Sequence, residues 1–322
     1  MNDFLNRFAP QLKEIDDALN QSLGARIPVV MDIVRYSLLG AGKRIRPLLF
    51  VLSSHLCGYQ GEDVYRLSTV FEYVHAASLL HDDVLDNADL RRSKPSARQV
   101  WGNSAAVLGG DFLYAAASAI AVECKNLELI QLLSDVLKRM VEGQLLELEH
   151  THDWKITKEA YMEIITAKTA ALIAAACTSG AMVARADDKT MRHLGEFGLN
   201  LGIAFQLMDD LLDYTSSPEV FGKPVGKDLK EGKITLPLVY FVSELEKGEA
   251  ESLAELFKSQ EEKDKDYEDL IRRVRTHGAI ERVRSEASKY VARAGEVLGL
   301  LPDSPGRQSL MELGTYILMR RR

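Results

Sequence analysis

Two aspartate-rich motifs are the residues in this sequence most able to do chemistry. The pattern Asp-Asp-x-x-Asp occurs at Asp82-Asp83-Val84-Leu85-Asp86 and again at Asp209-Asp210-Leu211-Leu212-Asp213, each within an apolar, helix-forming stretch. On a helix, residues four apart share a face at a separation of about 6 Å, so each motif pairs its first and last carboxylates. Like charges at this spacing repel and need a cation between them. Carboxylate oxygens with room for water and phosphate are typical ligands of Mg²⁺ that holds a phosphorylated substrate.

Basic residues are grouped in three places where they could bind phosphate. The groups are Lys43, Arg44 and Arg46; Arg91, Arg92 and Lys94; and Lys223, Lys227, Lys230 and Lys233. Arginine binds phosphate oxygens through paired donors, and lysine acts as a point charge. The pair Gly42-Lys43 does not belong to a nucleotide P-loop, because the earlier glycine is missing and Arg44 replaces the required Ser or Thr.

Three other polar residues lie inside apolar helical stretches. Lys168 is either a substrate-binding residue or a lysine whose amine reaches solvent, and Thr169 beside it can bond back to a carbonyl and bend the helix. His75 lies two helical turns before Asp82, and both substrate contact and a satisfied core histidine remain open for it. A separate polar group fits no standard zinc spacing and is interpreted as a helix terminus. Its members are Glu147, Glu149, His150, His152 and Asp153.

The elements that must position these residues are predicted to be helices. No proline occurs between Pro95 and Pro218, and this stretch is rich in Ala, Leu, Glu and Met. Amphipathic helices are predicted at about 3–23, 28–57, 61–88, 96–123, 126–149, 157–185, 187–216, 233–246, 249–260, 264–276, 278–299 and 305–321. No change of composition marks a linker. We therefore predict one all-α domain over residues 1–322, a helical bundle whose two aspartate motifs face each other across a deep central cavity.

Composition excludes several classes of partner and location. The formal net charge of −7 argues against a nucleic-acid surface. Cys57, Cys124 and Cys177 have no metal-ligand or redox spacing and indicate reduced thiols in a cytoplasmic protein. The first ten residues lack the apolar segment of a signal peptide. No run of roughly 18 uncharged apolar residues is present, so no transmembrane segment is expected, although transient membrane contact for product release is compatible with the sequence.

Taken together, these motifs give the chain a close resemblance to the trans-isoprenyl (polyprenyl) diphosphate synthases, including long-chain types such as octaprenyl and heptaprenyl diphosphate synthases. The resemblance runs from about Ser37 to Lys233 through Gly-Lys-Arg-x-Arg-Pro, His-Asp-Asp-x-x-Asp, Leu-Arg-Arg, Lys-Thr, Phe-Gln-x-x-Asp-Asp-x-x-Asp, Gly-Lys and Lys. In this family an allylic diphosphate primer ionises and isopentenyl diphosphate adds to the cation. The resemblance also implies a homodimer and three Mg²⁺ ions per active site.

The resemblance assigns a role to each motif residue. Asp82 and Asp86 would bind two Mg²⁺ ions and Asp209 a third, with Asp83, Asp210 and Asp213 acting through other groups or water. Residues for the allylic diphosphate would be Arg91, Lys168, Lys223 and Lys233. Residues for isopentenyl diphosphate would be Lys43, Arg46, His75 and Arg92. Thr169, Gln206 and the bent backbone at Lys168 would face the carbocation, and the expelled diphosphate or a group beside it would take the final proton.

Departures from the family pattern are confined to loop positions, and alternative functions fit less well. Asn87 and Ser93 differ from the commonest residues, which affects loop geometry and no phosphate or metal group. A terpene cyclase or a head-to-head condensing enzyme would not need Lys43, Arg46 and Arg92. A non-catalytic subunit of a heteromeric synthase would typically have lost aspartates that are intact here. A shorter-chain farnesyl or geranylgeranyl diphosphate synthase remains an alternative.

Product length in this family depends on how far a tunnel extends before a bulky side chain blocks it. Short-chain members similar to this chain carry aromatic residues just before the first motif, where this sequence has Ala77 and Ser78 beside Ala76. Further along the helix, the wall of the tunnel would include Val74, and Phe71 or Tyr73 could close it. Leu133, Leu137 and Met140 on another helix are further candidates for the floor. We expect a product of roughly seven or more isoprene units, since the helix is open for more than one turn above Asp82, a length suited to a quinone side chain.

Replacing Ala77 or Ser78 with Phe should shorten the product, because an aromatic ring would block the tunnel one helical turn from Asp82. Chain-length analysis of the extracted product measures the effect. A product of unchanged length from both variants would refute this tunnel direction.

Overall fold

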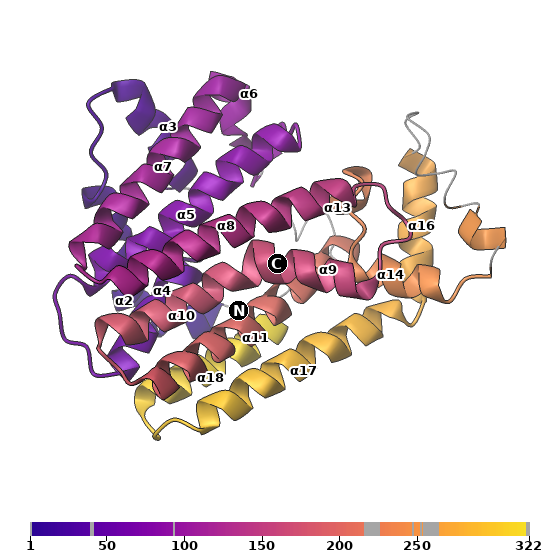
Figure 1. Ribbon diagram of the computed structural model, residues 1–322. Helices are drawn as coiled ribbons and strands as arrows, with labels where there is room; N and C mark the ends of the chain where they lie inside the picture. Colours follow the sequence, from indigo (N-terminus) through magenta and orange to yellow (C-terminus); the bar gives the residue numbers. More distant parts are fainter. Residues whose placement is uncertain are drawn as a thin grey trace. The chain divides into compact units, whose positions relative to one another are not determined.

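The computed structural model describes residues 2–38, 42–92, 94–215, 226–246, 248–251, 253 and 264–319. Figure 1 shows that helices make up nearly all of this part of the chain. The strands within it are β1 (Leu90–Arg91) and β2 (Lys94–Pro95), which pair antiparallel in a short hairpin. The predicted all-α class is confirmed.

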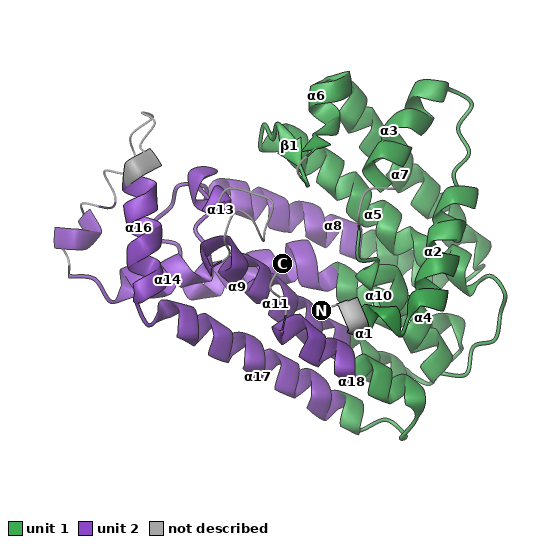
Figure 2. Ribbon diagram, turned by 180° about the vertical axis from the view of Figure 1, so that it is seen from behind, with its two compact units in different colours: residues 1–135, 172–195, 298–310 green, residues 136–171, 196–297, 311–322 purple. Residues whose placement is uncertain are grey.

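The chain divides into two compact units, coloured separately in Figure 2. Unit 1 comprises residues 1–135, 172–195 and 298–310, and unit 2 comprises residues 136–171, 196–297 and 311–322. The elements that lie wholly in unit 1 are α1 (Asn2–Asn6), α2 (Ala9–Gln21), α3 (Pro28–Leu38), α4 (Ile45–Leu56), α5 (Val64–Leu85), β1, β2, α6 (Ala97–Trp101) and α7 (Asn103–Glu123). Those wholly in unit 2 are α9 (Lys158–Ile165), the π-helical turn η1 (Thr166–Ala170), α13 (Lys227–Lys230), α14 (Leu236–Ser243) and α16 (Asp264–Thr276). Both units include residues of α8 (Leu127–Glu149), α10 (Ala171–Val183), α11 (Asp188–Thr215), α17 (Ala279–Gly299) and α18 (Pro305–Leu318). The assignment of a single domain to residues 1–322 stays a prediction.

Helix α5 forms the centre of unit 1. It contains neither Gly nor Pro, and its buried residues lie on every side of the helix, as expected for a helix with no solvent face. It packs against α2, α3, α4 and α7. The rings of Phe71 on α5 and Phe50 on α4 lie 5.5 Å apart between centroids, and both residues are 1% exposed. This packing fixes the helix whose last turn carries the first aspartate motif.

The core of unit 2 is built on α11 and the helices that follow it. Leu207, Leu211 and Tyr214 of α11 are buried, as are Leu236 and Leu238 of α14. Helix α14 packs against α9 and α16. The second aspartate motif therefore lies on the last turns of a helix whose other face is packed in the core.

Three predicted helices are interrupted in the structure. The predicted helix 3–23 is broken at Arg7–Phe8, and helix 28–57 ends at Leu38 and resumes at Ile45. In both cases a proline, Pro10 or Pro47, lies in the first turn of the second helix, where its missing N–H is tolerated, whereas the interior of a longer helix would not tolerate it. Helix 96–123 is split by Gly102, whose φ of 84° and ψ of 164° suit glycine alone.

Other boundaries agree closely with the prediction. Helices α8, α16, α17 and the continuous run α9–η1–α10 begin and end within two residues of the predicted positions. The predicted helix 61–88 ends earlier, at Leu85, and the short helix α13 and the hairpin were not predicted as elements. The predicted helix 249–260 falls largely outside the described residues, as do Lys223 and Ser93.

Among the described residues, two helical stretches are long and apolar enough to cross a membrane, judged by length and composition alone. They are Asn103–Glu123 and Lys158–Val183. In the second stretch 78% of the apolar window is buried, as in the core helix of a soluble protein, whereas in the first the value is 39%. Each stretch contains a charged residue in its interior, Asp111 or Lys168, so neither is the uncharged apolar run that the sequence analysis considered.

Candidate active site

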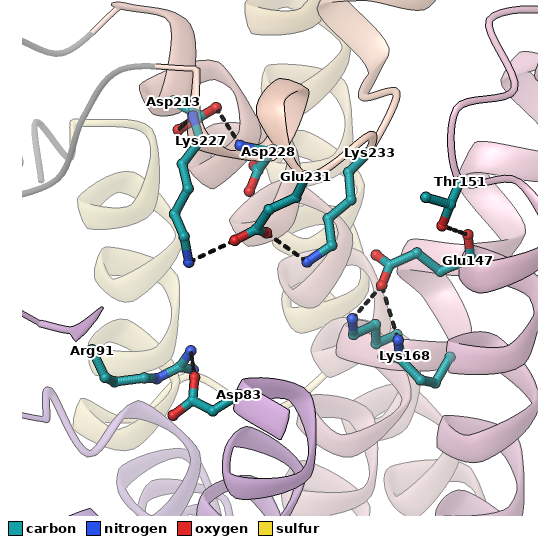
Figure 3. A network of polar contacts seen from close by, with 11 residues as sticks. Asp83, Arg91, Glu147, Thr151, Lys168, Asp213, Lys227, Asp228, Glu231 and Lys233 are labelled. Atoms are coloured by element: carbon teal, nitrogen blue, oxygen red, sulfur yellow. Dashed lines mark hydrogen bonds and ion pairs between the residues drawn. The ribbon is translucent and has the colours of Figure 1, made fainter. Parts of the chain in front are cut away.

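The first aspartate motif combines one buried carboxylate with two that are partly exposed. Asp83 is 4% exposed, while Asp82 and Asp86 are half-buried at the end of α5. Arg91 donates from Nη1 to Asp83 Oδ1 at 3.1 Å (Figure 3). The protein thus supplies a positive partner to the buried member of the motif. Asp82 and Asp86 keep the spacing and the partial exposure that metal ligands require.

The turn after α5 brings Arg91 back to the motif. Asp86 caps the helix, and Asn87 follows with a φ of 50°, a left-handed conformation that asparagine tolerates. Ser96 then ties the hairpin down, because its hydroxyl donates to the Ala88 carbonyl at 2.6 Å. Asn87, noted as a departure from the family pattern, therefore shapes this turn.

The predicted isopentenyl diphosphate residues of unit 1 lie near one another. Burial and then the charges of Arg46, Arg91 and Arg92 lower the pKa of His75 well below its usual value, so His75 is neutral at pH 7. The pKa of Arg92 is also lowered, by burial and by the neighbouring Arg91. Several guanidinium groups around one neutral imidazole form a pocket of positive charge that favours an anion. Lys43 is half-buried on the loop before α4.

The predicted tunnel residues are packed within unit 1. Phe71, Val74 and Ala77 are at most 1% exposed. Ser78 is half-buried, and its hydroxyl donates to the His75 carbonyl at 2.8 Å. The Tyr73 hydroxyl donates to the Leu19 carbonyl at 3.3 Å, which directs that ring toward α2. Phe71, paired with Phe50, is therefore the better candidate for the end of a tunnel along α5. The assignment of these residues to product length stays a prediction.

The second aspartate motif shows the same division of carboxylates. Asp210 and Asp213 are 3% and 4% exposed, while Asp209 is half-buried. Asp210 accepts hydrogen bonds from the Tyr161 hydroxyl at 2.5 Å and from Gln206 Nε2 at 2.7 Å. Burial and then the nearby Asp228 raise the pKa of Asp210 well above its usual value. Asp210 is thus held inside unit 2 by protein donors.

Asp213 holds the chain segment that follows the motif. Its two carboxylate oxygens accept the backbone N–H groups of Lys227 and Asp228, each at 3.2 Å (Figure 3). These are donors of the first turn of α13, where a carboxylate is favoured. Of the three carboxylates in this motif, Asp209 is the one whose exposure suits a metal ligand.

A π-helical turn carries Lys168 and Thr169. The turn η1 covers Thr166–Ala170, within a stretch that is otherwise α-helical. Such turns arise at single sites in helices and are frequent at functional sites. Lys168 Nζ lies 2.5 Å from Glu147 Oε2, and the Thr169 hydroxyl donates to Gln206 Oε1 at 2.9 Å. The bend predicted at Lys168–Thr169 therefore takes the form of a π turn.

Two glycines allow neighbouring helices to approach this turn closely. A Cβ on Gly143 of α8 would lie 2.7 Å from Ala167 Cβ, and one on Gly202 of α11 would lie 2.6 Å from Ala170 Cα. Both distances are far below van der Waals contact. The π turn is therefore held between α8 and α11 in unit 2 by contacts that only glycine permits.

A pocket in unit 2 gathers the predicted residues of this half of the site. It is lined by Glu147, Lys168, Thr169, Gln206, Asp210, Asp228 and Lys233, among others. Lys233 Nζ lies 3.0 Å from Glu231 Oε2, and Lys227 Nζ lies 2.9 Å from Glu231 Oε1, so Glu231 stands between the two lysines in Figure 3.

Several residues of this region were missed or interpreted differently from the sequence. Tyr161 and Glu231 had no assigned role, and a buried tyrosine or a glutamate near lysines gives no distinctive sequence signal. Glu147 was interpreted as part of a helix terminus, but its carboxylate forms an ion pair with Lys168. His150 does close the end of α8, with Nδ1 at 2.8 Å from Asp153 Oδ2.

Comparison with known proteins identifies the family. The pattern of the family described as Polyprenyl synthetase matches residues 27–274, which is most of the chain. The chain belongs to the polyprenyl synthetase family. Octaprenyl diphosphate synthase of Escherichia coli (strain K12) is 34% identical over 314 residues, covering 98% of this chain and 97% of that protein. All-trans-nonaprenyl-diphosphate synthase (geranyl-diphosphate specific) of Rhodobacter capsulatus is 34% identical over 323 residues, which cover 99% of this chain and 97% of that protein.

Solved structures agree with this assignment. The polyprenyl synthase of Caulobacter crescentus CB15, crystallised with calcium and isoprenyl diphosphate, has a TM-score of 0.95 and 34% sequence identity, covering 100% of this chain and 98% of that one. A decaprenyl diphosphate synthase from Rhodobacter capsulatus has a TM-score of 0.92 and 30% sequence identity, and the match covers 100% of this chain and 99% of that one. The all-α isoprenoid synthase fold and the classification as a prenyltransferase, both expected from the sequence, are confirmed.

Replacing Gly202 with Ala should destabilise the π turn, because the new methyl group would overlap the backbone of Ala170. We expect a loss of about 1–3 kcal/mol in the free energy of unfolding, measured by chemical denaturation, with lower prenyltransferase activity. Gly295→Ala is the matched control, since Gly295 lies inside α17 with nothing within 4 Å of its Cβ position. That variant should be neutral or slightly more stable. Equal effects at both glycines would contradict the close contact at Ala170.

Proposed function

We propose that the protein is a long-chain trans-polyprenyl diphosphate synthase. It would condense isopentenyl diphosphate head to tail onto an allylic diphosphate, with Mg²⁺ bound, to make a side chain for a quinone. The observation that carries this proposal is the division within each aspartate motif. Asp83, Asp210 and Asp213 are buried, while Asp82, Asp86 and Asp209 are partly exposed.

The carboxylates present fit magnesium. Among the residues that the structure describes, no three His, Cys, Asp or Glu side chains gather closely enough to hold a metal ion by themselves. Mg²⁺ commonly binds through one or two carboxylates and takes its other ligands from water and substrate phosphates. Asp82 and Asp86 would hold two such ions and Asp209 a third. Bound there, the ions would offset the negative charge that develops on the departing diphosphate.

Basic side chains would share this work on each substrate. Arg91, Lys168, Lys233 and Lys223 would neutralise the allylic diphosphate. Lys43, Arg46 and Arg92 would hold isopentenyl diphosphate as cations, while neutral His75 would donate a single hydrogen bond. Donors that are fixed before reaction would meet the condition for electrostatic stabilisation of a leaving group.

The π turn would serve the carbocation. Thr169 and Gln206 are joined by a hydrogen bond, and Gln206 is held in turn by Asp210. Their oxygens would lie beside the allylic cation, and the apolar residues around them would exclude water. The expelled diphosphate or a group beside it would take the proton lost from isopentenyl diphosphate.

A long product is supported by the relatives and by the residues before the first motif. The relatives described above are named octaprenyl and nonaprenyl synthases. Ala77 and Ser78 are small residues at positions where an aromatic residue would stop the growing chain. One further relative, 31% identical over 307 residues, is named Heptaprenyl diphosphate synthase component 2, from Bacillus subtilis (strain 168). Because of that name, one component of a two-component synthase is the second candidate function for this protein.

Three reduced cysteines support a cytoplasmic location. They are free thiols, with Cys177 buried and Cys57 and Cys124 half-buried. Burial, followed by the nearby Asp187, raises the pKa of Cys57 to about 11, and burial, followed by Asp63, raises that of Cys124 to about 11. Thiols with such a raised pKa are poor nucleophiles.

The purified protein should convert farnesyl diphosphate and radiolabelled isopentenyl diphosphate into a product of roughly seven or more isoprene units when Mg²⁺ is present, and EDTA should abolish this reaction. Asp82→Asn and Asp209→Asn should each lower kcat by about 10²-fold or more, while Asp32→Asn on the exposed side of α3 should not. Undiminished activity after complete removal of divalent ions would overturn the proposal. A protein inactive alone would favour the two-component enzyme.

We also propose a homodimer that covers the apolar face of α7. Leu108 and Val122 on this helix are 65% and 58% exposed, and exposed apolar patches on soluble proteins mark interaction sites. Leu108→Glu should shift the protein from dimer to monomer in analytical ultracentrifugation. Leu300→Glu is the matched control, because Leu300 is also 65% exposed but stands apart at the end of α17. A dimer that persists in both variants would exclude α7 as the interface.

A further inference from the structure

A buried arginine lies between two of the predicted isopentenyl diphosphate residues. Arg44 separates Lys43 from Arg46 and is 6% exposed at the beginning of α4. Its guanidinium donates from Nε to Asp16 Oδ1 at 2.8 Å, from Nη1 to Glu72 Oε1 at 2.8 Å and from Nη2 to the Leu38 carbonyl at 2.7 Å. These three bonds tie the loop before α4 to α2, α5 and α3.

The backbone of Arg44 adopts a left-handed conformation. Its φ of 52° and ψ of 33° are left-handed, a conformation disfavoured for residues other than glycine because Cβ crowds the carbonyl oxygen. Such a conformation persists only where the surroundings determine it. The three side-chain bonds of Arg44 are among the contacts that hold this turn.

Gly42 shows that the loop is built around the guanidinium. A Cβ at Gly42 would lie 2.6 Å from Arg44 Nη1 and 3.4 Å from Glu72 Oε1. A larger residue would displace the arginine from its partner. The segment from Gly42 to Arg46 therefore depends on the position of this one side chain.

The charges around Arg44 are balanced inside the protein. Glu72 is 5% exposed, so the pair is a buried one whose members need each other. Burial lowers the pKa of Arg44, but Glu72 and Asp16 outweigh that effect and raise it above its usual value. The charge of Arg44 also contributes, as the smallest of the causes, to the lowered pKa of His75 and of Arg92.

We propose that Arg44 is a positioning residue for isopentenyl diphosphate. Its contacts with Glu72, Asp16 and the Leu38 carbonyl fix the turn that carries Lys43 and Arg46, and it binds no substrate itself. The inference rests on the proposed function, since it assumes that Lys43 and Arg46 bind this diphosphate.

Arg44→Lys is the first test, because lysine keeps the charge but cannot reach three acceptors on different helices. We expect the KM for isopentenyl diphosphate to rise about tenfold or more, since small displacements of binding groups have large effects. The KM for the allylic diphosphate should stay within about twofold of wild type. Steady-state kinetics with each substrate varied in turn, at saturating concentration of the other, measures both values.

Neighbouring variants provide controls and a graded series. Arg66→Gln removes an exposed ion pair, since Arg66 on α5 lies 2.7 Å from Glu123 with side chains 51% and 46% exposed, and should change neither KM. Glu72→Gln, which weakens the buried partner, should act in the same direction as Arg44→Lys. Asp16→Asn should have a smaller effect, because the Asp16 side chain is 52% exposed.

Binding of isopentenyl diphosphate alone, measured by calorimetry, gives a readout independent of turnover. Arg44→Lys should weaken this affinity about tenfold, as it does the KM. Unchanged affinity, an equal rise of both KM values, or a lower melting temperature with wild-type KM values would overturn the inference. If Arg44→Lys does not fold, Glu72→Gln decides by the same measurements. If the wild-type protein binds isopentenyl diphosphate but elongates no allylic diphosphate, the proposed function is refuted. The affinity measurement would still test the role of Arg44 in that case.

Discussion

Carboxylates that share a helix face in an apolar setting repel one another and need compensating partners. In each unit, the arrangement around the aspartate motif depends on how these carboxylates are compensated. Protein donors hold the buried members of the two motifs. Arg91 serves Asp83, Tyr161 and Gln206 serve Asp210, and backbone N–H groups serve Asp213. The hairpin and α9 each provide one of these donors, and α13 provides two. Their places in the fold follow from the electrostatic demand of the motifs.

The same constraint acts on the cations. Lys168 is paired with Glu147, Lys233 with Glu231 and Arg44 with Glu72. If the allylic diphosphate binds Lys168 and Lys233 as proposed, it must compete with the carboxylates that contact these lysines in the structure. Arg44 differs because its pair with Glu72 is deeply buried. Such a buried pair holds structure, whereas the half-buried lysine pairs can exchange partners.

Sequence periodicity predicted the long helices and the positions of both motifs, because apolar faces repeat over many residues. It failed at Pro10, Pro47 and Gly102, where one residue overrides a long favourable pattern. The division within each motif was expected from the family resemblance, but its physical basis could not be derived from local sequence. Asp83 depends on a residue eight positions later, and Asp210 on Tyr161, 49 positions earlier. Contacts over such separations exist only once the fold is formed.

The π turn shows the limit of this reasoning most clearly. Thr169 gave a local reason for a bend, but the structure holds the turn between Gly143 and Gly202, which no local pattern connects to it. A glycine inside a helix costs about 1 kcal/mol relative to alanine, so its presence often indicates that a neighbouring backbone needs the space. Gly295 is equally helical and has nothing within 4 Å of its Cβ position. The sequence alone cannot separate these cases, because the difference lies in which residues of another helix approach the glycine.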